Sequence, residues 1–125
     1  MSDAEVDAAS VGVRGLRAIM ELDAELAIGG LPGFMGNSAG RLGPAAVELM
    51  RKVDEACAAR LQSIFDRCGL NPYISDSQAR LEKVLATVSA DQLHELRDEA
   101  MDCISDFVNK LPHYIRAHPE EFFKP

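Results

Sequence analysis

Residue types that mark catalytic, metal-binding and disulfide-rich proteins are scarce in this chain. It has no tryptophan, and only three cysteines and three histidines among 125 residues. Cys57 and Cys68 fall on one face of a predicted helix about 16 Å apart, which is too far for a disulfide. No cysteine pair has the C-x2-C spacing of a zinc site. We therefore expect reduced thiols in the core, no metal and no cofactor.

Long apolar runs and clusters of positive charge are also missing. No stretch approaches the roughly 20 apolar residues of a membrane-spanning helix, and the acidic residues 1–10 do not resemble a secretory signal. The net charge of −7 opposes direct binding to a nucleic-acid backbone, which requires clustered lysine and arginine. The chain is therefore expected to be cytoplasmic, with neither a membrane nor nucleic acid as a direct partner.

The dominant feature that is present is helical periodicity. Apolar residues recur at three- and four-residue steps over 3–28, 44–68, 76–87 and 89–111. With 47% hydrophobic and 26% charged residues, this predicts one all-α domain over 1–125, a small helical bundle of four main helices plus a short C-terminal helix. Pro112 should end or kink the last main helix. The aromatic residues of 112–125 predict that this segment packs back onto the bundle or, alternatively, is an aromatic anchor for a partner.

The expected helix boundaries rest on capping residues. Pro44 suits a first helical position, and Gly69 suits the position that follows a helix end. Ser75 or Asp76 is expected to cap the third helix, and Ser89 to open a capping box at the start of the fourth.

The first predicted helix is apolar on more than one side. Gly12 and Gly15 each weaken it by up to about 1 kcal/mol relative to alanine. They mark either the true start of the helix or a site where another helix packs closely. The broad apolar surface indicates burial on two sides or pairing with another chain, so a homo-oligomer formed through this helix is one hypothesis. The narrow stripe comprises Val6, Ala9, Val13, Leu16, Met20, Ala24 and Ala27, and the residues that widen it are Val11, Ile19, Leu22 and Leu26.

Residues 29–43 contain six glycines and a proline, which predicts a long Gly-rich loop between the first two helices. Apolar residues such as Phe34 and Met35 suggest that the loop tucks side chains onto the bundle. Alternatively, it is a binding loop or lid, in which Phe34, Met35 and Arg41 would contact a ligand. The segment lacks the residue order of a phosphate-binding loop.

The clearest pattern is an acidic face on the helix over 89–111. On a helical wheel its carboxylates cluster within an arc of about 100°, opposite the apolar face. Several are like-charged neighbours three or four residues apart, each pair costing a few tenths of a kcal/mol, whereas a solvated face usually mixes its signs. A solvated face without function is the alternative. The acidic face comprises Asp91, Glu95, Asp98, Glu99, Asp102 and Asp106.

Arg97 lies within the apolar arc of the same helix. A buried guanidinium needs a carboxylate or carbonyl partner. Three alternatives are open for Arg97. Its aliphatic stem could lie along the apolar surface while the guanidinium stays in water. It could form a salt bridge to another helix, for which Asp54 is a candidate, or contact the carboxylate of a ligand.

Catalytic patterns such as a nucleophile elbow or a zinc-protease motif are absent. The preferred hypothesis is a non-enzymatic interaction module (an adaptor, inhibitor or assembly protein) that docks a basic surface of another protein through the acidic face, with nucleic-acid mimicry as a variant. The alternative is a helical domain that binds a small molecule or cofactor, with the 29–43 loop as lid and Arg97 as an anion contact.

Overall fold

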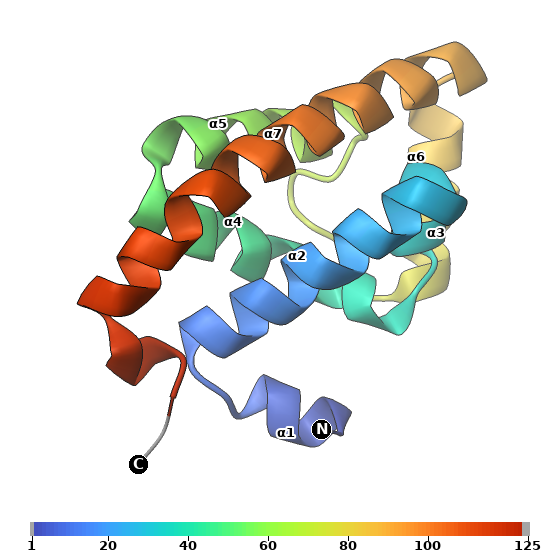
Figure 1. The fold of residues 1–125 in the computed structure, drawn as a ribbon. Helices are drawn as coiled ribbons and strands as arrows, with labels where there is room; N and C mark the ends of the chain where they lie inside the picture. Colours follow the sequence, from blue (N-terminus) through green and yellow to red (C-terminus); the bar gives the residue numbers. More distant parts are fainter. Residues whose placement is uncertain (1, 124–125) are drawn as a thin grey trace.

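The computed structural model describes residues 2–123, except for the side chain of Asp3, and this part of the chain is helical with no strand (Figure 1). The predicted all-α class is confirmed. Within these residues, seven α-helices and two 3-10 helices take the place of the four main helices expected. They are α1 (Asp3–Asp7), α2 (Val11–Ile28), α3 (Gly30–Met35), η1 (Ser38–Leu42), α4 (Gly43–Val53), α5 (Glu55–Arg67), α6 (Ser77–Thr87), α7 (Ala90–Ala117) and η2 (Pro119–Glu121).

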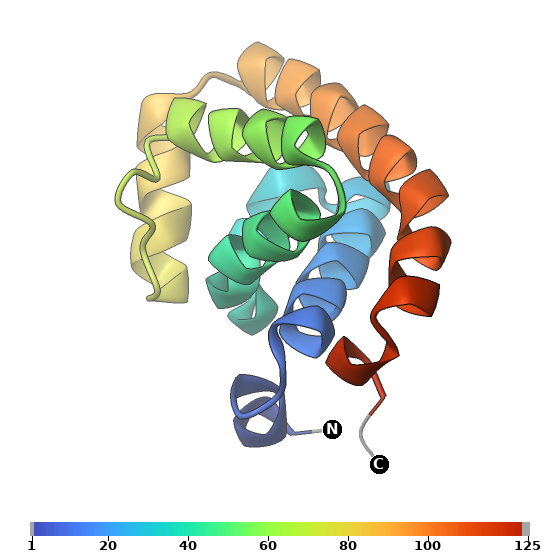
Figure 2. The same ribbon diagram turned by 90° about the vertical axis from the view of Figure 1, so that its left-hand side faces the viewer.

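The centre of the bundle is the contact between α2 and α4, and α5, α6 and α7 surround it (Figure 2). The two helices approach closely because Gly15 has no side chain. A Cβ atom there would lie 2.5 Å from Leu49 Cβ and 2.8 Å from the carbonyl oxygen of Ala45. Close helix packing at Gly15 is therefore confirmed.

The prediction of one continuous helix over 3–28 is wrong, because the chain turns between α1 and α2. Ser10 stands at this turn with an extended backbone. Its hydroxyl accepts a hydrogen bond from the Val13 N–H and donates one to the carbonyl of Glu121. The side chain thus satisfies a free N–H group at the start of α2 and ties that start to the C-terminal segment.

The helix predicted over 44–68 is also two helices, which meet at Asp54. The backbone of Asp54 is extended, with φ −158° and ψ 110°, and its carboxylate accepts a hydrogen bond from the Ala56 N–H at 3.0 Å. The apolar periodicity continues across this break and therefore did not reveal it. The end of α5 is as predicted, since Gly69 has φ +81° and the two amides that follow Cys68 close a Schellman motif.

The prediction of a long loop over 29–43 is wrong as well. The helices α3 and η1 occupy most of the segment and turn its apolar side chains inward, so that Leu31, Phe34 and Met35 are fully buried. Gly30, at φ +68°, makes the sharp entry into α3 that other residues would adopt only with strain. The glycines here serve compact turns and close approaches.

A buried arginine that the sequence analysis did not single out holds this region in place. Arg80 on α6 is fully buried, and its Nε donates a hydrogen bond to the Met35 carbonyl at 2.8 Å. One terminal nitrogen donates to the carbonyls of Ile74 and Ser75, and the other donates to that of Asn37. The guanidinium satisfies carbonyls left free at the end of α3 and before α6, so it joins the two helices.

Pro112 does not end the last long helix, so that part of the prediction is wrong; the kink expected as the alternative stays a prediction. α7 continues through it to Ala117 and curves around the bundle (Figure 2). A proline inside a helix removes one backbone hydrogen bond at a cost of about 3 kcal/mol. Burial of Leu111 before it and of Tyr114 and Ile115 after it offsets this loss.

After α7, the chain folds back through η2 onto α2 over residues 118–123; residues 124 and 125, the end of the segment expected to pack on the bundle, lie outside the described part. The helix caps predicted at Asp76 and Ser89 are both present, the second as a full capping box. Over residues 2–123, no helix combines the length and hydrophobicity required to cross a bilayer.

Candidate functional site

The acidic face predicted from the sequence lies on the solvent side of α7. All six of its carboxylate side chains are exposed, over the first seventeen residues of the helix. Their environment changes from one edge of the arc to the other: one edge lies beside α5, the opposite edge lies beside the end of α2, and the middle is open to solvent.

The edge toward α5 is neutralised within the chain. Glu99 pairs with Arg67 at 2.8 Å and Asp106 with Arg60 at 2.6 Å. Glu99 and Asp106 are the two members at the outer edge of the arc on a helical wheel, so the helix turns this edge toward its neighbour. The six carboxylates are indistinguishable in the sequence, because the pattern of a single helix does not reveal that α5 lies beside one edge of it.

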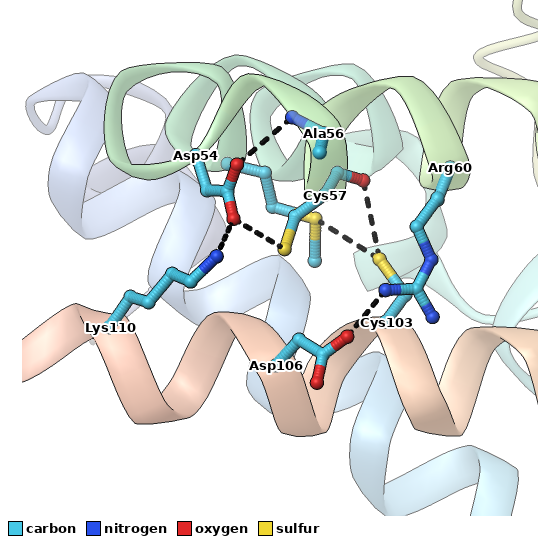
Figure 3. Close-up of polar contacts among 8 residues, drawn as sticks. Asp54, Ala56, Cys57, Arg60, Cys103, Asp106 and Lys110 are labelled. Carbon is cyan, nitrogen blue, oxygen red and sulfur yellow. Dashed lines mark hydrogen bonds and ion pairs between the residues drawn. The ribbon is translucent and has the colours of Figure 1, made fainter.

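Asp54 and Lys110 add a further ion pair between α5 and α7 beyond this edge (Figure 3). The hydrogen bond from Lys110, followed by that from the Ala56 N–H, lowers the pKa of the Asp54 carboxyl. In the same contact, the hydrogen bond to Asp106 raises the pKa of Arg60. Exposed ion pairs contribute at most about 1 kcal/mol each, so their main effect is to fix which helices face one another.

The opposite edge of the arc is occupied by Asp98. Its carboxylate lies 3.9 Å from Arg97 Nη1 and 4.0 Å from His94 Nε2. Arg97 also donates a hydrogen bond from Nε to the Leu26 carbonyl at the end of α2, at 2.8 Å. The suggested bridge between Arg97 and Asp54 is not formed, because Asp54 is turned toward Lys110.

The middle of the arc is different. Asp91, Glu95 and Asp102 form no ion pair with any residue in the described part of the chain. We call these three the central acidic row. Beside Asp102 lies a shallow groove of about 340 Å³ between α5 and α7, whose walls also carry Arg60 and Arg67. The carboxylates of α7 that lack an ion-pair partner are therefore those of the central acidic row, and not the ones that face the groove arginines.

The four residues considered as ligand contacts do not meet in one place. Phe34 and Met35 are fully buried in the core. Arg41 pairs with Asp7 at 2.7 Å, and Arg97 lies against the end of α2. The 29–43 segment is packed under Arg80 and hydrogen-bonded to Tyr73, so it is built as a wall of the bundle.

Two side-chain clusters that the sequence analysis did not predict contain potential metal ligands or nucleophiles. His118, Glu120 and Glu121 bring three ligand atoms within 4.8 Å of one another. However, both oxygens of Glu121 already have partners: one pairs with Lys52, and the other accepts a hydrogen bond from the Tyr114 hydroxyl. The positive charge of Lys52 would also repel a metal ion bound at this place.

The second cluster is the pair of thiols between α5 and α7 (Figure 3). Cys103 is fully buried, and its thiol donates to the Cys57 carbonyl at 3.2 Å. Burial raises the pKa of Cys103 to about 11 and raises that of Cys57 as well. Thiols with raised pKa values are poor nucleophiles near neutral pH, which agrees with the prediction of core thiols.

Within residues 2–123, α7 thus presents three exposed carboxylates without an ion-pair partner, and exposed negative charge of this kind attracts cationic groups. Comparisons of the chain with protein-family models, with curated proteins and with solved structures gave no match.

Proposed function

We propose that this protein is a non-enzymatic, cytoplasmic interaction module that docks a basic surface of another protein through α7. The observation that supports the proposal most directly is the central acidic row: Asp91, Glu95 and Asp102 point to solvent on a long helix and have no cationic partner within residues 2–123. Carboxylates that are already paired by α5 would have to exchange partners on binding, but these three would not.

The row suits a partner that carries repeated positive charge. From Asp91 to Asp102 the row advances by eleven positions, or about 16 Å of helix axis at 1.5 Å per residue. Complementary charges across an interface increase the association rate and select the partner more than they raise the affinity. A basic groove that normally holds a phosphate backbone also requires regularly spaced negative charge, which makes mimicry of nucleic acid a specific form of the same proposal.

The test compares two double charge reversals that alter net charge equally. Glu95→Lys with Asp102→Lys changes the central acidic row and leaves every α5–α7 ion pair intact. Asp23→Lys with Glu48→Lys changes two exposed carboxylates on α2 and α4 that form no ion pair in residues 2–123. Circular dichroism should show the same helix content for both variants.

Immobilised wild-type protein and both variants are then used to capture proteins from host extract at low and high salt. We expect the wild type and the α2/α4 variant to capture the same basic protein at low salt. The α7 variant should capture about tenfold less of it. High salt should lower capture by the wild type to a similar extent, because exposed charges are screened. Equal capture by both variants would contradict the proposal. Competition by duplex DNA for the captured protein distinguishes mimicry from other docking.

A further inference from the structure

The side of α2 that faces away from the core carries a second apolar surface. Its inner side is buried and carries Gly12, Gly15, Ile19 and Leu22. On the outer side, Met20 is 62% exposed. An open apolar groove of about 470 Å³ runs along this outer side, and Ile115, Phe122 and Phe123 from the C-terminal segment form its other wall. We call the residues along this side the α2 stripe: Val13 and Leu16, which are half-buried, with Leu16 also packed against the core, and the exposed Met20, Ala24 and Ala27.

The α2 stripe is symmetric about its middle residue. Leu16 and Ala24 lie four residues on either side of Met20, and Val13 and Ala27 lie seven residues on either side. At 100° per residue, the inner pair falls about 40° to the left and right of Met20 and the outer pair about 20°. A twofold axis through Met20 that pairs two antiparallel copies of α2 therefore places each member opposite its counterpart.

The side chains in such a pair complement one another in size. Leu16 of one copy meets Ala24 of the second, and Val13 meets Ala27. A large residue thus faces a small one at every position except Met20, which is flexible enough to pack against itself. Helices packed at 8–10 Å require small side chains at their contact, and the two alanines supply them.

The charges flanking the stripe are also complementary. Arg17 and Glu21 form an ion pair at 3.2 Å within one helix and lie on the same side of the stripe. The twofold rotation keeps this side together in both copies, so Arg17 of one copy lies about 3 Å along the axis from Glu21 of the second. The pair can therefore be shared across the interface; Asp23, on the other side of the stripe, is exposed and forms no ion pair within residues 2–123, so it has to stay at the solvated rim of the contact.

We infer that the α2 stripe is a homodimer interface, in which two copies of this chain pack α2 antiparallel about a twofold axis at Met20. The stripe spans about 21 Å, so the interface is small and belongs to the weak class, with dissociation in the micromolar range. It differs from the docking surface on α7 because its contacts are apolar, so added salt leaves it intact.

Sedimentation velocity over a series of protein concentrations tests the association. Met20→Glu places two carboxylates on the twofold axis and should leave only monomer, whereas Met101→Glu, at an exposed methionine on α7, should dimerise like the wild type. Both positions are on the surface, so both variants should keep their helix content. A wild type that remains monomeric at millimolar concentration, or a Met20→Glu variant that still dimerises, would overturn the inference.

Cysteine trapping under mild oxidation tests the register, with wild-type protein as background for the buried native thiols. Met20→Cys should cross-link to itself, because the two copies of this residue meet on the axis within disulfide distance. Leu16→Cys and Ala24→Cys should cross-link when mixed, but not alone, because like residues then lie about 12 Å apart along the axis. Cross-linking of Met20→Cys no faster than that of Met101→Cys would refute the arrangement; a parallel pair would instead cross-link Leu16→Cys alone.

Discussion

Replacing Arg80 by methionine should destabilise the fold more than any surface substitution of the same kind. Methionine keeps much of the volume of the stem but donates no hydrogen bond. The guanidinium donates to four backbone carbonyls and, more weakly, to the Ser77 hydroxyl. In the variant, the carbonyl of Asn37 still accepts hydrogen bonds from the Gly40 N–H and from the Ser77 hydroxyl.

The expected magnitude follows from the carbonyls that lose their partner. Met35, Ile74 and Ser75 have no other hydrogen bond to their carbonyl oxygen in the described part of the chain. A buried polar group left unsatisfied costs about 1–3 kcal/mol. The Met35 carbonyl is in the buried contact and the other two are partly reached by water, so the sum is about 3–4 kcal/mol. That is a large part of the ~5–15 kcal/mol that stabilises a typical domain.

The assay is urea unfolding followed by circular dichroism at 222 nm, on the wild type, Arg80→Met and the matched control Arg60→Met. Arg60 forms an exposed ion pair with Asp106, so its replacement should cost at most about 1 kcal/mol. Equal unfolding midpoints for the two variants would refute the reasoning, because they would show that the buried guanidinium contributes no more than an exposed one.

Three further predictions concern packing, pH and thiols. Gly15→Ala should destabilise the protein by about 1–2 kcal/mol despite its better helix propensity, because the new methyl group meets Leu49; thermal unfolding measures this. Lys110 holds the pKa of Asp54 below its usual value, so this stabilisation is complete above the ordinary carboxyl pKa near 3.9 and is lost as the pH falls through the lowered value. Asp54→Asn keeps the helix cap, so its urea midpoint should approach that of the wild type as the pH drops from 7 to 3; a constant difference would contradict this. The three cysteines should resist iodoacetamide at pH 8 in folded protein and react in denaturant, because burial raises their thiol pKa values; fast modification of folded protein would count against the described core.

Part of the fold could be predicted because it depends on neighbours in the sequence. The caps at Asp76 and Ser89 and the positive φ at Gly69 follow from hydrogen bonds that span only a few residues. The apolar faces of the helices follow from the same local geometry. By contrast, the breaks at Ser10 and Asp54 were missed because apolar periodicity continues through both.

The all-α class, the helix caps, the placement of thiols in the core and the existence of an acidic face could be read from the sequence, because each depends on the period of the helix or on contacts within a few residues. Three outcomes emerge only when the helices pack together: which carboxylates α5 neutralises, which side of α2 stays exposed, and the burial of Arg80 under residues 29–43. Those outcomes depend on helices distant in sequence, whose approach sets the partners available to each charged or apolar side chain.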